Sequence, residues 1–397
     1  MKSIRHFFSS TIFVRILTVS LNFLSSILIN RSLGLELKGQ YTTILNYSSF
    51  IQLFINAGIC YAYPFINREH GKEKAKEIIS TVIWLQTGVL FIIGIFSFLA
   101  KMAINITTIV FLATATLCNG QFSFIALIDD IKSRNYILLS SIVFYIVLNL
   151  VAIRIAPGNL YIILALLILK YTYEIAMLTI HNHYLLFNIK TLNLDIIKKV
   201  LKIGLPTAVM AILISCNYNI DVFMLNWMKS DDIEIGIYGV AFSLSSMMWI
   251  IPDAFKELIY NKSARDNDNH FVLKYIVTNA LLCICIFLGF ALLGKWFLQI
   301  AYGEEYVICY SVCLTLFAGV ITMIPFKLIH PIYVNQGKPK SVMGLLLLAI
   351  VANIIASWLL IPNYGAFGAA IASVISYAIS GLLFFIKYYF DYCKKDV

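Results

Sequence analysis

The chain has 397 residues, of which 60% are apolar and 13% charged, and its mean hydropathy is +0.86. Soluble domains carry about 45–50% apolar and about 25% charged residues, so this composition excludes soluble enzymes, disordered proteins and secreted disulfide scaffolds. Apolar runs of about 20 residues recur and predict an all-α integral membrane protein. The net charge of +10 is therefore interpreted by the positive-inside rule, and no nucleic-acid partner is expected.

Twelve apolar segments alternate with short polar connections along the chain. They run over residues 9–30, 41–63, 78–100, 103–127, 136–153, 159–187, 203–228, 236–255, 272–293, 306–330, 341–361 and 364–386. Each is near the length of about 20 residues with which a helix crosses a bilayer. We predict about 12 transmembrane helices: a six-helix N-terminal lobe over residues 1–188, a cytoplasmic linker over 189–202 and a six-helix C-terminal lobe over 203–397.

Lys and Arg are distributed unevenly between alternate connections. If the N-terminus is cytoplasmic, the connections on that side hold 22 of these residues and those on the opposite side hold 6. Cytoplasmic loops carry the excess of positive charge in membrane proteins, so both termini are predicted to be cytoplasmic. Arg15 interrupts the first apolar segment and no A-x-A cleavage site follows, which favours an uncleaved first helix over a signal peptide.

The second half of the sequence repeats features of the first half at an offset of 197 residues. The matched pairs are Gly39 with Gly236, Tyr41 with Tyr238, Ser48 with Ser245, Ser49 with Ser246, Ala57 with Ala254 and Arg68 with Arg265. Asn149 and Pro157 similarly resemble Asn353 and Pro362. Because each half has an even number of predicted helices, the halves have the same orientation. A repeat of this kind predicts an axis along the membrane normal and a central cavity.

Polar residues recur at helical spacing on the first, second, seventh and eighth predicted helices, which places them on one face of each. In the first half these residues include Thr18, Asn22, Asn46, Ser49 and Asn56. The repeat offset maps them to Ser215, Asn219, Ser243, Ser246 and Asp253. Small polar residues often only form hydrogen bonds between membrane helices. Four long stripes on repeat-related helices favour a water-filled cavity that binds substrate.

Four charged residues lie well inside predicted helices, away from their ends, where each costs about 2.5–3.5 kcal/mol to insert. Arg15 has no acidic partner three or four residues away, so it is interpreted as a substrate ligand. Lys170 and Glu174 are four residues apart and are predicted to form an intrahelical ion pair, with a role in transport as the alternative. Asp221 is either a structural hydrogen-bond acceptor or part of the same cavity.

Motifs of known chemistry are missing from the sequence. None of the eight Cys lies in a CxxC pattern or has a His at metal-ligand spacing, and no phosphate loop, GxSxG or HExxH motif occurs. We therefore expect no catalytic residues, no metal site and no cofactor. Coupling of activity to a proton or sodium gradient is left open.

Several segments resemble one family of membrane proteins. Arg31–Tyr41 has the form R-x-L-G-x-x-x-x-G-x-Y, which resembles the link between helices 1 and 2 of Wzx-type polysaccharide flippases in the multidrug/oligosaccharidyl-lipid/polysaccharide (MOP) exporter superfamily. Further similar segments are Gly204–Pro206, Asn219–Asp221, Gly236–Ala241, Asn335–Lys340 and Ile361–Ala370. Together they extend the resemblance over essentially the whole chain.

The resemblance implies a MATE-like fold of two six-helix lobes with alternating access. It also implies a substrate, an oligosaccharide unit of O-antigen or capsule linked to undecaprenyl pyrophosphate, moved from the cytoplasmic to the periplasmic leaflet of the bacterial inner membrane. Proteins of this type have cationic lumens, for which Arg15 is the first candidate here and Lys170 the second. Other polysaccharide-assembly membrane proteins are possible partners.

Two alternatives remain at this point. The first is a multidrug/cation antiporter of the same superfamily, although a cationic substrate would favour buried carboxylates and the first helix carries Arg15 and no acid. The second is a polysaccharide polymerase or ligase, which would be expected to have a large periplasmic loop that the sequence lacks.

Overall fold

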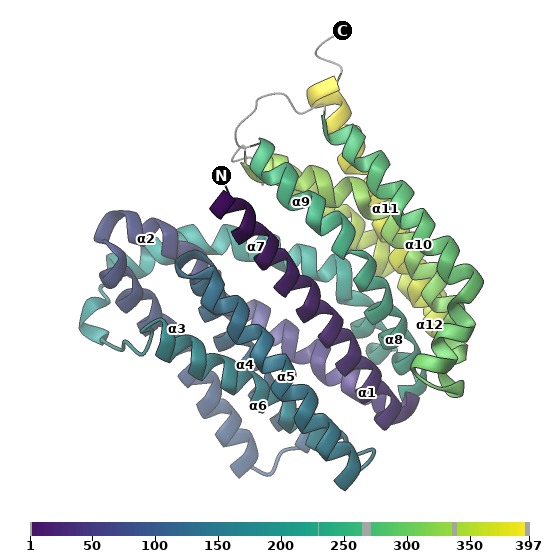
Figure 1. Ribbon diagram of the computed structural model, residues 1–397, viewed down its shortest axis with the longest axis horizontal. Coiled ribbons are helices and arrows are strands. Elements are labelled where there is room, and N and C mark those ends of the chain that lie inside the picture. Colours follow the sequence, from purple (N-terminus) through teal and green to yellow (C-terminus); the bar gives the residue numbers. More distant parts are fainter. Residues whose placement is uncertain (1, 229, 264–270, 336–339, 394–397) are drawn as a thin grey trace. The chain divides into compact units, whose positions relative to one another are not determined.

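The computed structural model describes residues 2–228, 230–263, 271–335 and 340–393 (Figure 1). Within these ranges the chain forms helices and no strands. The helices are α1 (Lys2–Asn56), α2 (Tyr63–His70), α3 (Lys72–Leu99), α4 (Ile104–Asp129), α5 (Ile131–Ile155), α6 (Leu160–His181), α7 (Leu194–Trp227), α8 (Asp232–Met248), α9 (Ile250–Ser263), α10 (Phe271–Ala301), α11 (Tyr310–Asn335) and α12 (Lys340–Tyr388). Short helical turns lie at Ile59–Ala62, Ile189–Thr191, Glu304–Cys309 and Tyr389–Cys393. The all-α prediction is confirmed.

Ten helical stretches in the described ranges are long and apolar enough to cross a membrane. Two of them, Leu17–His70 and Ser341–Tyr392, have 54 and 52 residues, more than twice the length of about 20 that one crossing needs. Each contains a glycine with non-helical backbone, Gly34 with φ 70° and Gly365 with φ 51°. Positive φ strains other residues and breaks the helix at these points. The predicted count of twelve crossings stays a prediction.

The break at Gly365 is fixed by a carboxylate. The Glu234 Oε2 atom of α8 accepts a hydrogen bond from the backbone N–H of Ala366 at 2.6 Å. This bond satisfies one of the N–H groups that a helix leaves free at its N-terminus. A negative charge at that end also complements the helix dipole. The second part of α12 thus begins as a capped helix.

Several predicted segment ends differ from the observed helix ends by more than three residues, and two of them have a clear cause. α7 begins at Leu194 rather than at residue 203, because the apolar pattern stops at Lys198, Lys199 and Lys202 whereas the helix continues through them. α6 ends at His181, before the predicted end at residue 187, and the following chain turns through His183 at a φ of 57°. The segment predicted as a linker, 189–202, therefore contains a short helical turn and the first turns of α7.

The chain packs into two compact units. Unit 1 comprises Met1–Gly34 and Ile44–Ile212, and unit 2 comprises Leu35–Thr43 and Leu213–Val397. The nine-residue piece of α1 after Gly34 therefore belongs to unit 2, while the rest of α1 belongs to unit 1. The lobe boundaries predicted from the sequence stay a prediction.

Each unit has its own interior. In unit 1, α4 packs against α3 and α6, and α5 packs against α6. A cluster of buried residues that includes Tyr63, Phe122 and Tyr184 fills one end of this unit. In unit 2, α11 is central and contacts α8, α9, α10 and α12.

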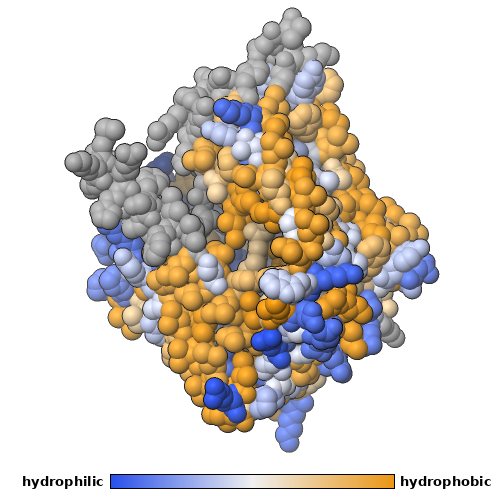
Figure 2. All heavy atoms as spheres, turned by 45° about the vertical axis from the view of Figure 1, so that its right-hand side comes forward, coloured by the Kyte–Doolittle hydropathy of each residue, from blue (hydrophilic) through white to orange (hydrophobic). Residues whose placement is uncertain are grey.

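The outer surface of both units is rich in apolar side chains, and Figure 2 shows them over much of the face that it draws. On α3, Phe96 and Leu99 are exposed, and on α10 Leu292 and Trp296 are exposed. In a soluble protein such surfaces would cause association, whereas in a bilayer they contact lipid. The distribution confirms an integral membrane protein.

Candidate functional site

The predicted polar stripes occupy partly exposed positions in both units. In α1, Thr18 Oγ1 donates to the Val14 carbonyl at 2.8 Å, and Asn22 Nδ2 donates to the Thr18 carbonyl at 2.8 Å. Arg15 lies in α1, and its side chain falls outside the part of the structure that is described. Asn46 is partly exposed and Ser49 is exposed on the same helix. Their role in binding substrate stays a prediction.

The matching stripe of unit 2 has the same local bonding. Asn219 Nδ2 donates to the Ser215 carbonyl at 3.3 Å, one turn earlier in α7. In α8, Ser243 Oγ donates to the Gly239 carbonyl at 2.7 Å and Ser246 Oγ to the Ser243 carbonyl at 2.8 Å. Because these side chains bond within their own helices and are partly exposed, they form a polar helix face compatible with contact to water.

Asn56, the last stripe residue of α1, forms a cross-helix amide contact. Its Oδ1 atom accepts a hydrogen bond from Nε2 of Gln121 in α4 at 3.3 Å. Gln121 is fully buried and also donates to Oε1 of Gln86 in α3 at 2.9 Å. Gln86 Nε2 in turn donates to the Ile55 carbonyl at 3.0 Å. The end of α1 is thus tied to α3 and α4 by neutral amide groups.

Lys170 and Glu174 form the ion pair that their spacing predicts, with Lys170 Nζ 3.6 Å from Glu174 Oε1. Glu174 is buried and accepts two further bonds, from Asn119 Nδ2 of α4 at 2.7 Å and from Ser141 Oγ of α5. The Lys170 ammonium lies 5.2 Å from the centre of the Tyr171 ring, at cation–π distance. The carboxylate therefore joins three helices of unit 1.

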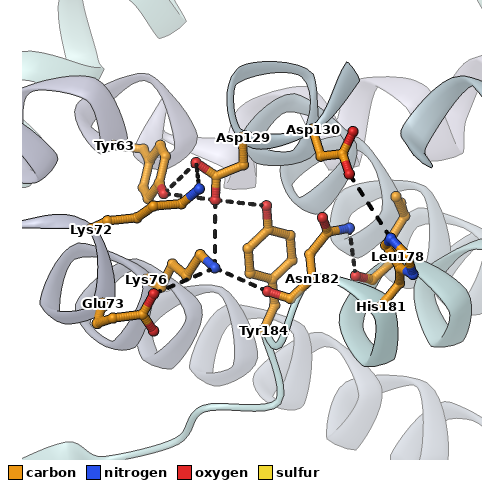
Figure 3. Close-up of polar contacts among 10 residues, drawn as sticks. All are labelled: Tyr63, Lys72, Glu73, Lys76, Asp129, Asp130, Leu178, His181, Asn182 and Tyr184. Atoms are coloured by element: carbon orange, nitrogen blue, oxygen red, sulfur yellow. Dashed lines mark hydrogen bonds and ion pairs between the residues drawn. The ribbon is translucent and has the colours of Figure 1, made fainter. Parts of the chain in front are cut away.

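Asp129, at the end of α4, is the centre of a second charged cluster in unit 1 (Figure 3). Its carboxylate accepts hydrogen bonds from the phenols of Tyr63 at 2.8 Å and Tyr184 at 3.2 Å. The ammonium groups of Lys72 and Lys76, one turn apart on α3, lie 3.5 and 3.8 Å from it. This cluster holds together the ends of α2, α3, α4 and the chain that follows α6.

Tyr184 lies outside the membrane-spanning segments and closes this cluster. Burial and the adjacent Asp129 carboxylate raise the pKa of its phenol above the ordinary value. The phenol therefore stays protonated and remains a hydrogen-bond donor to Asp129. The sequence did not predict this cluster, because its members lie 53 to 66 residues from Asp129. The spacing of Lys72 and Lys76 was its one local signal.

Asp221, in α7, is fully buried in unit 2. Its Oδ2 atom accepts a hydrogen bond from the Tyr238 phenol of α8 at 2.9 Å. The same phenol lies 2.9 Å from the hydroxyl of Ser373 in α12. The Asp221 Oδ1 atom is buried without a hydrogen-bond partner among the described residues. Asp221 thus links α7, α8 and α12 through one of its two oxygens.

Asp253, the last stripe residue of unit 2, forms an ion pair that sequence reasoning missed. Its Oδ1 atom lies 3.0 Å from Nζ of Lys327 in α11. Only 6% of the Lys327 side chain is exposed, whereas 38% of Asp253 is. The positive-charge count placed Lys327 in a cytoplasmic connection, but it lies inside α11 and is buried. No local pattern could find it, because its partner is 74 residues away.

The described residues contain no group that suggests a metal site. Among the described residues, no three His, Cys, Asp or Glu side chains are grouped so that they could hold a metal ion. The seven described cysteines are free thiols. The polar clusters are instead built from carboxylates, ammonium groups, amides and phenols. Groups of these kinds can form hydrogen bonds and ion pairs with a polar ligand.

Comparison with solved structures gives the class of fold. An inward-facing multidrug resistance MATE family transporter of the MOP superfamily matches with a TM-score of 0.69 and 13% identity, over 93% of this chain and 93% of that one. The lipid II flippase MurJ, in an inward closed conformation, matches with a TM-score of 0.72 and 16% identity, over 96% of this chain and 87% of that one. A mutant MATE transporter of Vibrio cholerae matches with a TM-score of 0.56 and 13% identity, over 96% and 94%. The protein has the multi-pass membrane fold of the MOP superfamily.

Sequence comparison gives the family. The model of the polysaccharide biosynthesis protein family matches residues 6–252, which is more than half of the chain. No curated protein sequence matches this chain significantly. The protein belongs to the polysaccharide biosynthesis protein family, and the resemblance noted in its sequence motifs is confirmed at that level.

Proposed function

We propose that this protein is a flippase that moves an undecaprenyl-pyrophosphate-linked oligosaccharide, an O-antigen or capsule repeat unit, from the cytoplasmic to the periplasmic leaflet of the inner membrane. The family membership carries this proposal, since the family is one of polysaccharide biosynthesis and the fold is one of membrane transporters. The protein is proposed to act without catalytic residues.

The chemistry of the substrate explains why a protein is needed. A pyrophosphate with several sugars does not cross hydrocarbon unaided, because its charge and hydroxyls would lose their hydrogen bonds to water. The polar stripes of α1, α7 and α8 offer replacement hydrogen bonds, and Arg15 and Lys170 offer countercharge. The polyprenyl tail needs no protein environment because it is as apolar as the lipid. Rocking of two lobes about such a site would expose it to each side in turn.

The charged groups of the described helices support an anionic rather than a cationic substrate. Glu174, Asp129 and Asp253 each have a lysine within 4 Å. A cation antiporter needs a buried carboxylate that is free to bind its substrate. Asp221 is the exception, and we propose that it serves coupling to a proton or sodium gradient, since one of its oxygens has no partner among the described residues.

The proposal is tested by deletion of the gene in a strain that makes surface polysaccharide. Lipid-linked repeat units should still be made but should stay in the cytoplasmic leaflet, and surface polysaccharide should be lost. The intact gene should restore export, whereas a copy with Arg15→Ala should not, although its protein should insert at normal levels. Collapse of the proton or sodium gradient with an ionophore should stop export if Asp221 couples it.

Other outcomes separate the alternatives. A deletion strain that keeps its polysaccharide and becomes sensitive to cationic dyes would favour a multidrug/cation antiporter. A strain in which single repeat units reach the periplasm without being polymerised would favour an enzyme. Full export with the Arg15→Ala copy would show that Arg15 is not a substrate ligand.

A further inference from the structure

The two units contain the same cross-helix contact in two chemical forms. The repeat offset of 197 residues relates Asn56 to Asp253. Asn56 contacts Gln121 in α4, on the fourth predicted membrane segment of the first half, and Asp253 contacts Lys327 in α11, on the fourth of the second half. The distances are 3.3 Å for the amide pair and 3.0 Å for the ion pair. The contact is neutral in unit 1 and ionised in unit 2.

Packing alone does not require the charges of unit 2. The amide pair of unit 1 shows that neutral side chains of similar size can join the equivalent helices. Burying an ion pair costs desolvation energy that its attraction often fails to recover, so such a pair is a poor source of stability. The charge of Lys327 therefore calls for an explanation other than folding.

The surroundings of Lys327 are rich in hydrogen-bond donors and aromatic faces. Its ammonium lies 4.4 Å from the centre of the Trp249 ring and 5.6 Å from that of Tyr218. The Trp249 Nε1 and Tyr377 Oη atoms are buried without a partner among the described residues. These two rings lie 6.4 Å apart, so the groups belong to one cluster. Indole N–H and ammonium groups only donate, which suits a ligand rich in oxygen atoms.

The exposure of the two charged partners is unequal. Asp253 is partly exposed and can return to water with its charge hydrated, whereas Lys327 is buried and cannot. An anion that takes the place of Asp253 beside the Lys327 ammonium therefore displaces a carboxylate that loses little free energy when it moves into water. Lys256, which is exposed on α9, is close enough to add to the positive potential at Lys327. Lys327 and Lys256 thus both contribute positive charge near this site.

We propose that Lys327, with the faces of Trp249 and Tyr218, binds the phosphate and adjoining sugar of the transported lipid, and that Asp253 holds the ammonium until that phosphate displaces it. This inference rests on the proposed function and names a binding site within it. Lys327 lies toward the end of α11 that the Lys and Arg distribution assigns to the cytoplasm, the side from which the lipid would be loaded. Aromatic faces beside a phosphate-binding cation are suited to a sugar ring.

Binding is tested with the purified full-length protein in nanodiscs and undecaprenyl pyrophosphate as the probe. Lys327→Gln should weaken binding at least about tenfold, because it removes a charge-assisted hydrogen bond to the phosphate. Asp253→Asn should tighten binding, because it frees the ammonium. A structural ion pair would instead show weaker binding for both variants, and that result would overturn the proposal.

A double variant keeps the test independent of folding. Asp253→Asn with Lys327→Gln rebuilds in unit 2 the amide pair that unit 1 already contains, so it should fold with a normal melting temperature. It should bind the probe as weakly as Lys327→Gln alone. Lys199→Gln, which removes a lysine from an exposed ion pair of unit 1, is the matched control and should bind normally. Normal binding by the double variant would contradict the proposal.

Two further experiments test which lipid the site binds and whether a negative result concerns the site or the proposed function. Phosphatidylglycerol in place of the probe should not compete; if it competes equally, the site binds general lipid phosphate and the proposal for the transported lipid is wrong. In the deletion strain, the intact gene should restore export and the double variant should not. If the intact gene fails, the proposed function fails; if both genes restore export, only the assignment of Lys327 fails.

Discussion

Some buried charged residues of this protein have partners far away in the sequence, as Lys327 has in Asp253. The ion pair of Lys170 with Glu174 could be predicted, because a spacing of four residues brings both onto one helix face. The other two partners of Glu174 could not, since Asn119 and Ser141 are 55 and 33 residues away and no local pattern links them. The same limit hid Lys327 from sequence reasoning. The partner of a buried charged residue could thus be predicted from the sequence only where both residues lie on one helix.

The Glu174 cluster gives a prediction about stability. Glu174→Leu or Lys170→Met alone should destabilise the protein by about 3–5 kcal/mol, because each leaves a buried charge unpaired. Glu174→Leu should be the more harmful, since Asn119 and Ser141 lose their acceptor as well. The double variant should be more stable than either single variant. Melting temperatures of the purified proteins check the order.

A control and an export assay decide the role of this pair. Glu69→Gln removes the partner of Lys199 in an exposed ion pair, which contributes about 0–1 kcal/mol, so it should leave the melting temperature nearly unchanged. If the double variant is stable but no longer exports polysaccharide, Lys170 is a substrate ligand. If it is stable and exports normally, the pair is structural only.

At the scale of elements, the two copies of the repeat meet where α1 crosses α8. A side chain at Gly39 would collide with the backbone oxygen of Asp232, and one at Gly236 with that of Leu35. The offset of 197 relates Gly39 to Gly236 and Leu35 to Asp232, so the two contacts are reciprocal. Such reciprocity means that a local two-fold axis passes through the crossing. The repeat was visible in the sequence, but equivalence of two glycines does not predict their contact.

This crossing predicts opposite effects for the same substitution at different glycines. Gly236→Ala should lower the stability by about 1–3 kcal/mol, because its new methyl group overlaps the α1 backbone, which cannot rotate away. Gly289→Ala, on α10 in the same unit, should be neutral or stabilising, since a methyl group there meets no atom within 4 Å and alanine favours helix by about 0.5–1 kcal/mol. Thermal unfolding of both variants measures the difference. Equal effects would mean that the helices do not cross at this contact.

For the whole molecule, the class of fold could be predicted because the bilayer restricts the choices. Helices satisfy their own backbone hydrogen bonds, so apolar segments of spanning length predict them directly. The two glycine breaks also agree with the segment map: Gly34 lies in the predicted connection between residues 30 and 41, and Gly365 lies next to the one between residues 361 and 364. The membership of Leu35–Thr43 in unit 2 was hidden, since it depends on contacts with α8 and not on the order of the helices.

The orientation of the whole chain provides the last prediction. Lys38 and Lys327 are buried in unit 2 rather than placed in loops, but removing both from the count takes one residue from each side and preserves the strong bias. The excess of positive charge therefore still predicts cytoplasmic termini. A reporter that is active only outside the cytoplasm should be silent when fused after Lys395 and active when fused after Asp232, at the start of α8. The opposite pattern would reverse the orientation, and Lys327 would then face the side to which the lipid is delivered.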